Sequence, residues 1–158
     1  MSAAKSGCRD QTNPFILSSM VTTDDSLAVL VIDGAAFSDL DGFAREFSKL
    51  LCHHTWRGNV DAFNDIFRGG FGTPEAGWVL RWLDSDSSRS ALGYKATIQW
   101  LEGVLLTCHP SNRPQVEDKL HAARRGEGAT LFDMIVEIIR YHGPDGPESE
   151  HGVLLDLR

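Results

Sequence analysis

An unbroken apolar run near the start of the chain most constrains its fold. Residues 27–32 read Leu-Ala-Val-Leu-Val-Ile, and Asp33-Gly34 ends the run. A short run of this kind predicts a β-strand that is covered on both faces, as in the centre of a parallel sheet. The chain therefore begins its ordered part with a strand that needs helices packed around it.

Two further strands are predicted, at residues 78–83 and 153–157. Arg81 and Asp156 interrupt their apolar patterns, which indicates one wet face in each and favours edge positions. Three segments carry apolar residues at helical spacing: 38–51, 90–108 and 131–142. A more polar helix is predicted over 114–125, with Pro114 near its start and Gly126 just beyond its end. We therefore expect an α/β fold, a three-stranded parallel β-sheet packed by helices, with the first strand in the middle.

Capping residues support the bounds of two of these helices. Ser38 and Asp41 form a capping signature for the first one. Thr130 and Asp133 resemble a capping box for the last one.

Length and composition limit the class of protein. The 158 residues suit one domain, predicted to span 26–158, preceded by a poorly ordered polar arm over 1–25. No apolar run reaches the length of a membrane span, and no signal peptide is visible, so we expect a cytoplasmic protein. Three cysteines at unmatched spacing fit reduced thiols. The net charge of −7 argues against nucleic-acid binding and suits a basic partner.

The stretch from Trp56 to Phe67 carries the most informative pattern. It predicts a loop that enters a short helix at Asn59, a favourable N-cap. Asp61 and Asp65 are four residues apart, so they share one face and repel each other by about 0.2–0.5 kcal/mol. The presence of two aspartates that destabilise their own helix indicates that their negative charge serves to contact another molecule.

The residues Gly58-Asn59-Val60-Asp61-Ala62-Phe63-Asn64-Asp65 resemble the G-x-N-L-D-A-L-x-D core of the barstar family. Members of that family are intracellular inhibitors of barnase-type ribonucleases. The glycine stands one place nearer the asparagine than in the family pattern. The order of strands and helices also agrees, over residues 27–158, apart from a helical insertion within about 95–128.

The resemblance implies roles for individual residues. Asp65 matches the family's central aspartate, which takes the place of a substrate phosphate among the enzyme's basic residues. Asp61 matches a second contacting aspartate, Asn59 the helix cap at the contact, and Glu137 a glutamate that pairs with an enzyme arginine. The expected partner-binding set is Trp56, Arg57, Gly58, Asn59, Asp61, Ala62, Asn64, Asp65 and Glu137.

The same resemblance implies a partner and a role. The partner would be a basic, extracellular-type ribonuclease, whose active site the acidic helix and loop would block. The protein would act as an antitoxin or immunity partner, with no catalytic residues, no cofactor, no metal, no direct contact with nucleic acid or membrane, and a monomeric free state. Thr55, Asn64 and Gly70 stand where the family has aromatic residues, which points to a different ribonuclease or weaker binding.

Other functions compete with this hypothesis. The acidic helix could be an ordinary solvated face, with Arg68 pairing Asp65 at i, i+3. The chain could be an interaction module for another basic protein. A carboxylate-dependent hydrolase would need Asp61, Asp65 and Glu137 in a pocket. Zinc could be held by Cys52-His53-His54 and Cys108-His109, although neither has paired-ligand spacing.

Overall fold

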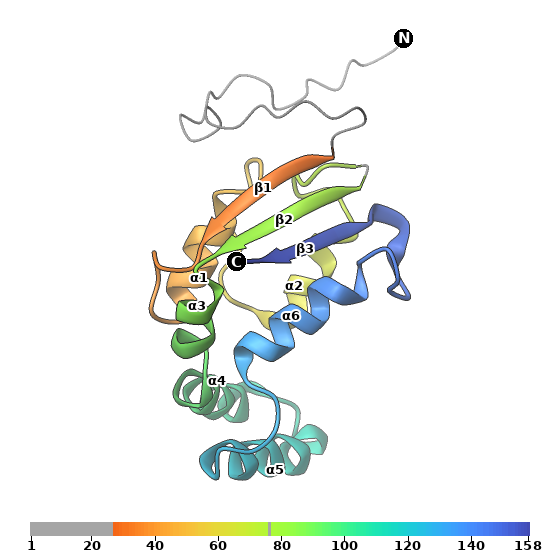
Figure 1. Ribbon diagram of the computed structural model, residues 1–158. Coiled ribbons are helices and arrows are strands. Elements are labelled where there is room, and N and C mark those ends of the chain that lie inside the picture. The colour runs from red at the N-terminus through yellow and green to blue at the C-terminus, as the bar shows by residue number, and fades with distance from the viewer. Residues whose placement is uncertain (1–26, 76) are drawn as a thin grey trace.

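The computed structural model describes residues 27–75 and 77–158. Three strands form one parallel sheet in the order β1-β2-β3 (Figure 1). Their bounds are β1 Ala28–Asp33, β2 Trp78–Leu83 and β3 Val153–Leu157. The prediction of an α/β fold with a three-stranded parallel sheet is confirmed. The predicted N-terminal arm, residues 1–25, lies outside the described residues.

Six α-helices accompany the sheet within the described part of the chain. Their bounds are α1 Leu40–Ser48, α2 Val60–Ile66, α3 Ser85–Ala91, α4 Tyr94–Thr107, α5 Arg113–Arg124 and α6 Leu131–Tyr141. The capping box predicted for the last helix is present, because Thr130 accepts from the Asp133 backbone and Asp133 accepts from the Thr130 backbone. None of the described helices is long and apolar enough to cross a membrane.

Two helix boundaries differ from the predictions. Asp39, and not Ser38, caps α1, since its carboxylate accepts a 2.7 Å hydrogen bond from the backbone N–H of Gly42. The helix predicted over 90–108 corresponds to α4, which begins only at Tyr94, while residues 90 and 91 belong to the preceding helix α3. The side chain of Leu92 is buried in the core, and Gly93 adopts the extended conformation of an N-cap for α4. Tertiary burial at this point therefore overrides the helical period.

The strand order corrects the prediction for β1. This strand lies at an edge of the sheet, not in the middle, and β2 lies between β1 and β3. Val29 and Val31 on its outer face are 45% and 47% exposed, so β1 is covered on one face only. The apolar run was therefore no evidence for burial on both faces.

Strand β2 is the central strand, although the charge of Arg81 predicts an edge position for it. The guanidinium Nε of Arg81 donates a 2.8 Å hydrogen bond to Asp156 of β3, the residue directly opposite in the strand register. The two charged residues thus pair across the sheet on its open face. The prediction that β2 has one solvent-exposed face is therefore correct. The prediction that β2 lies at an edge of the sheet is wrong. The edge position predicted for β3 is confirmed.

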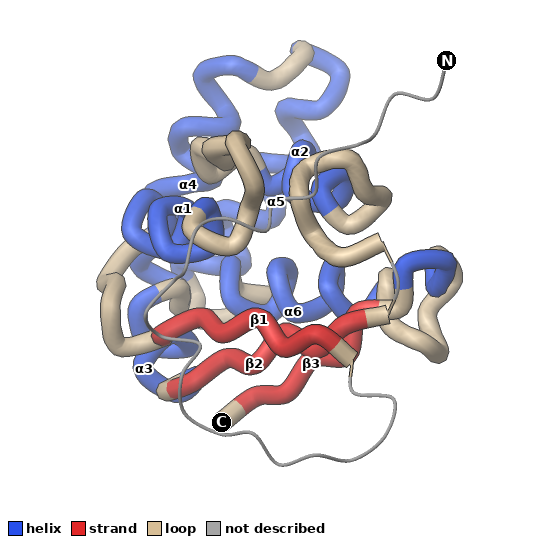
Figure 2. The backbone as a smooth tube through the Cα atoms, turned by 90° about the horizontal axis from the view of Figure 1, so that it is seen from above, coloured by secondary structure: helices blue, strands red, loops and turns tan. Residues whose placement is uncertain are grey.

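The helices cover a single face of the sheet, which gives a two-layer arrangement. α1, α2 and α6 lie on one side of the three strands (Figures 1 and 2). Fully buried aromatic residues fill the space between the layers, and the rings of Phe43 and Trp82 stack with centroids 5.2 Å apart. Trp78 and Trp82 are both buried in this core.

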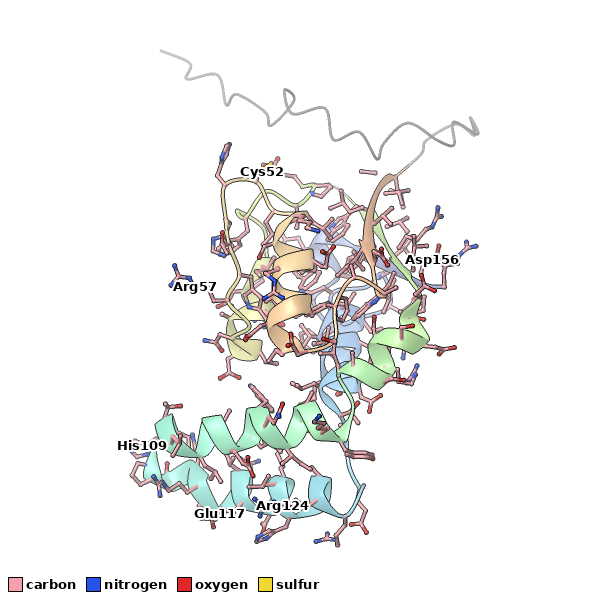
Figure 3. All side chains as sticks on the ribbon, turned by 90° about the vertical axis from the view of Figure 1, so that its left-hand side faces the viewer. Cys52, Arg57, His109, Glu117, Arg124 and Asp156 are labelled. Atoms are coloured by element: carbon pink, nitrogen blue, oxygen red, sulfur yellow. The ribbon has the colours of Figure 1, made fainter. Side chains whose placement is uncertain are left out.

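Helices α4 and α5 form a hairpin that projects from the end of this two-layer body (Figures 1 and 3). The hairpin has a small core of its own, with Leu101 and Leu120 buried between the two helices. Trp100 is half-buried and packs against both this small core and the main one. That the segment 95–128 is an insertion relative to the family stays a prediction.

The cysteines differ from the expectation of reduced thiols at one position. Cys108 at the end of α4 is a free thiol. Cys52, in the turn after α1, is disulfide-bonded. The prediction is therefore wrong for Cys52.

Ser88 provides a test of the packing between the sheet and α3. Its buried hydroxyl accepts a 2.8 Å hydrogen bond from the indole N–H of Trp82 and lies 3.3 Å from the carbonyl oxygen of Gly34. Ser88→Ala leaves the buried indole N–H without an acceptor, so we expect a loss of about 1–3 kcal/mol in the free energy of unfolding. Urea unfolding followed by tryptophan fluorescence measures it. Ser87→Ala, at an exposed position of the same helix, is the control, and equal midpoints for the two variants would contradict the prediction.

Candidate functional site

The loop that precedes α2 is fixed to the end of α1 through one serine. The backbone N–H of Trp56 donates to the Ser48 hydroxyl at 2.9 Å, and that hydroxyl lies 3.1 Å from the Trp56 carbonyl. The Trp56 indole N–H donates to the backbone carbonyl of Asn59 at 2.8 Å. Gly58 has a φ of +82°, a left-handed conformation that side chains disfavour. These bonds hold the loop in one shape before α2 begins.

Helix α2 starts where the sequence predicts. The Asn59 side chain caps it by accepting a 3.1 Å hydrogen bond from the backbone N–H of Asp61. Phe63 and Ile66 are buried in the core, so the opposite side of the helix faces outward. Asp61 and Asp65 are exposed on that outer side. The amphipathic pattern therefore turns the two carboxylates toward solvent.

Residues of α2 and α6 line a common groove of about 440 Å³. Asp61 and Asn64 line it from α2, and Glu137 lines it from α6. Val60, Met134 and Ile138 provide apolar lining. Predicted site residues from two segments that are far apart in the sequence thus meet at one surface depression.

Asp65 stands beside this groove and pairs with Arg68. The guanidinium Nη1 lies 2.8 Å from the Asp65 carboxylate. The same guanidinium binds Glu148 through two hydrogen bonds of 2.9 Å, Nε to Oε2 and Nη2 to Oε1. The alternative pairing considered from sequence is therefore present. However, Asp65 stays 58% exposed, and two carboxylates share one cation, so the cluster keeps a net negative charge.

Asn64 also has an internal partner. Its side-chain oxygen lies 2.8 Å from Nε2 of His142, a buried histidine that follows α6. The ring of His142 stacks on Phe67 with centroids 5.6 Å apart. This polar contact connects α2 to the end of α6.

Two of the predicted contact residues are placed differently from the rest. Trp56 is only 4% exposed, because its ring packs among Phe43, Phe47 and Phe63. A side chain this buried has little surface to offer a partner, contrary to the expectation that Trp56 is a contacting aromatic. The Trp56 side chain instead packs in the core and stabilises the loop. Gly58 is also buried. Arg57 is exposed, and its side chain projects away from the body of the protein (Figure 3).

Several residues at the site were not found from sequence. Ser48 fixes the loop, Glu148 holds Arg68, and Trp100 and Lys119 of the α4–α5 hairpin line the groove. A motif around residues 58–65 contains no signal for any of them, because they come from segments that only folding brings near α2.

The competing sites receive no geometric support. Cys52 and His109 lie at opposite ends of the molecule (Figure 3). Among the described residues, no group of three or more His, Cys, Asp or Glu side chains is arranged to hold a metal ion. Asp65 does not line the groove that holds Asp61 and Glu137, so the three carboxylates that a hydrolase would need do not share one pocket.

The fold and the site together define a small α/β protein with an exposed acidic face on a short helix. The family model described as Barstar (barnase inhibitor) matches residues 27–115 of the chain. That match covers more than half of the chain, so the protein belongs to the barstar family. The members of this family are non-enzymatic inhibitors, and this chain is not an enzyme. No curated protein and no solved structure matched the chain.

The pair of Arg68 and Glu148 generates a pH-dependent prediction. The guanidinium, through its hydrogen bonds and charge, holds the pKa of Glu148 below its ordinary value of 4.5. Because folding lowers this pKa, the pair stabilises the folded state above pH 4.5, and this stabilisation is lost as the pH falls through the lowered pKa. We expect Arg68→Gln to raise the Glu148 pKa toward its ordinary value and to lower stability at pH 7 but not in acid.

Carbon-13 NMR titration of the glutamate carboxyl groups measures the first effect, and thermal unfolding at a series of pH values measures the second. Lys95→Gln removes an exposed cation of α4 that lies outside the groove, and it serves as the control. An unchanged Glu148 pKa in Arg68→Gln would show that the ion pair does not persist in solution.

Proposed function

We propose that this protein inhibits a basic, barnase-like ribonuclease by placing the carboxylates of α2 and α6 in the enzyme's active site. One observation carries the proposal: Asp61 and Glu137 line the same groove, and Asp65 is exposed one helical turn further along α2. These are the three acidic positions that the family resemblance assigns to the contact.

The chemistry of a ribonuclease cleft favours such an occupant. The cleft must be cationic because it binds a polyanion. Carboxylates accept charge-assisted hydrogen bonds from arginine and lysine, and arginine can bind one in a bidentate manner. The loop before α2 is already fixed by Ser48 and Trp56, so little conformational entropy is lost on binding. The net charge of −7 also accelerates encounter with a basic enzyme, and salt weakens this effect.

The ion pair between Asp65 and Arg68 is compatible with this function. Both side chains are more than half exposed, and ion pairs of this kind contribute about 0–1 kcal/mol. An arginine or lysine of the enzyme can therefore replace Arg68 at the Asp65 carboxylate at little cost. Arg68 remains bound to Glu148 when this happens, so the exchange does not leave the Arg68 guanidinium without a partner.

The biological role follows from the proposed activity. The protein would act in the cytoplasm as a monomer, either protecting the host from its own secreted ribonuclease or serving as the immunity partner of a toxin. An interaction module directed at another basic protein is the second candidate, because the same acidic groove suits any cationic surface and Trp56 is unavailable as a contact.

Replacing Asp65 and Asp61 singly by Ala tests the proposal. We expect each change to weaken inhibition by at least about 2 kcal/mol, roughly thirtyfold, which is the size typical of interface hot spots. The barnase–barstar complex is itself one of the systems from which that general magnitude comes. The measurement is ribonuclease activity titrated with inhibitor at several salt concentrations. Folding should be unchanged, because both carboxylates are exposed.

Asp86→Ala, which removes an exposed carboxylate on α3, is the matched control and should inhibit as well as the unmodified protein. The inhibitor hypothesis fails if the unmodified protein silences no barnase-type ribonuclease at equal molarity. Binding to a basic protein without any effect on RNA cleavage would favour the second candidate.

A further inference from the structure

The α4–α5 hairpin forms part of the groove that holds the proposed contact residues. Trp100 of α4 and Lys119 of α5 line it together with Asp61 of α2 and Glu137 of α6. The groove therefore has walls from α2, from α6 and from the hairpin. A partner that reaches Asp61 and Glu137 must also meet the hairpin.

Two cationic side chains, Arg68 and Lys119, line the groove, and they differ in their ion pairing. Arg68 is bound by Glu148 and by Asp65. Lys119 is exposed and forms no ion pair with any residue that the structure describes, although three carboxylates line the same groove. An ammonium group without an internal partner can bind an external carboxylate without first losing an ion pair.

Trp100 offers a second kind of contact. Trp56, Trp78 and Trp82 are at most 4% exposed, whereas Trp100 is half-buried, so it is the one tryptophan of the four that solvent reaches appreciably. An indole face beside two carboxylates is a favourable surface for a guanidinium or an ammonium group, because the ring attracts cations. The aliphatic part of such a side chain would lie on Met134 and Ile138.

We propose that the hairpin determines which ribonuclease is bound, through Trp100 and Lys119. This proposal rests on the inhibitor function above. The groove takes a basic side chain of the enzyme between Trp100, Asp61 and Glu137, and Lys119 pairs with an acidic side chain next to it. Enzymes that place a second basic side chain there are repelled by Lys119, so the same residue selects for one partner and against others.

Changing the charge of Lys119 is the central experiment, carried out with the ribonuclease that the unmodified protein inhibits at equal molarity. We expect Lys119→Glu to raise the dissociation constant at least about tenfold and Lys119→Ala to raise it about threefold. Lys95→Glu, an equal charge reversal on α4 outside the groove, should leave it unchanged. Lys119 is exposed, so its variants should fold normally, which thermal unfolding can verify.

Fluorine-19 NMR distinguishes direct contact of Trp100 with the ribonuclease from a purely structural role of Trp100. The full chain is labelled with 5-fluorotryptophan, and the Trp100 signal is assigned from Trp100→Phe. Binding of unlabelled ribonuclease should shift the fluorine-19 resonance of Trp100 more than those of the three buried tryptophans.

The outcomes distinguish the two proposals. If Asp65→Ala loses inhibition while Lys119→Glu binds as tightly as or more tightly than the unmodified protein, the hairpin proposal is overturned and the inhibitor function stands. An unmoved Trp100 resonance in a saturated complex overturns it as well. If no ribonuclease is inhibited by the unmodified protein, both proposals fall.

Discussion

The packing of Phe63 into the aromatic core is the interaction on which the acidic site depends. Its ring centroid lies 4.8 Å from that of Phe47, 4.7 Å from that of Trp56 and 5.0 Å from that of Phe67. Helix α2 has only seven residues, too few to be stable alone, and its two aspartates repel each other. The buried aromatic face therefore supplies the stability that the outer face lacks. The position of each carboxylate follows from this anchoring.

Electrostatics at the end of α2 connects the site to the chain beyond α6. Arg68 joins Asp65 to Glu148, and Asn64 joins the same helix to His142. Two segments separated by most of the domain are thus held together by polar contacts beside the groove. Because the ion pairs are exposed and weak while the ring contacts are buried, the core fixes the helix and the ion pairs orient its side chains. The acidic face is consequently rigid in its backbone but free to exchange partners at its carboxylates.

Local signals in the sequence were sufficient for the elements and insufficient for their arrangement. Asn59 and the Thr130–Asp133 box mark helix starts through contacts within three residues, so their roles could be predicted. The strand order could not, because the charge of Arg81 is accommodated by Asp156 of a distant strand. The burial of Trp56 was missed for a similar reason, since a loop aromatic beside a contact motif does not reveal whether its ring turns inward. The groove was predictable only as far as the motif and Glu137 extend.

Under the two proposals made above, the groove separates affinity from selectivity. The carboxylates stand on helices anchored in the main core, and any cationic cleft attracts them. Trp100 and Lys119 stand on a hairpin with its own small core, joined to the main body at Trp100. Substitutions on the outer side of this hairpin can change which surface fits the groove without disturbing the packing of α2. The acidic residues are held by the main core, and the residues proposed to select the partner are held by the hairpin. Changes in the hairpin can therefore alter the choice of partner while the acidic residues keep their mode of binding.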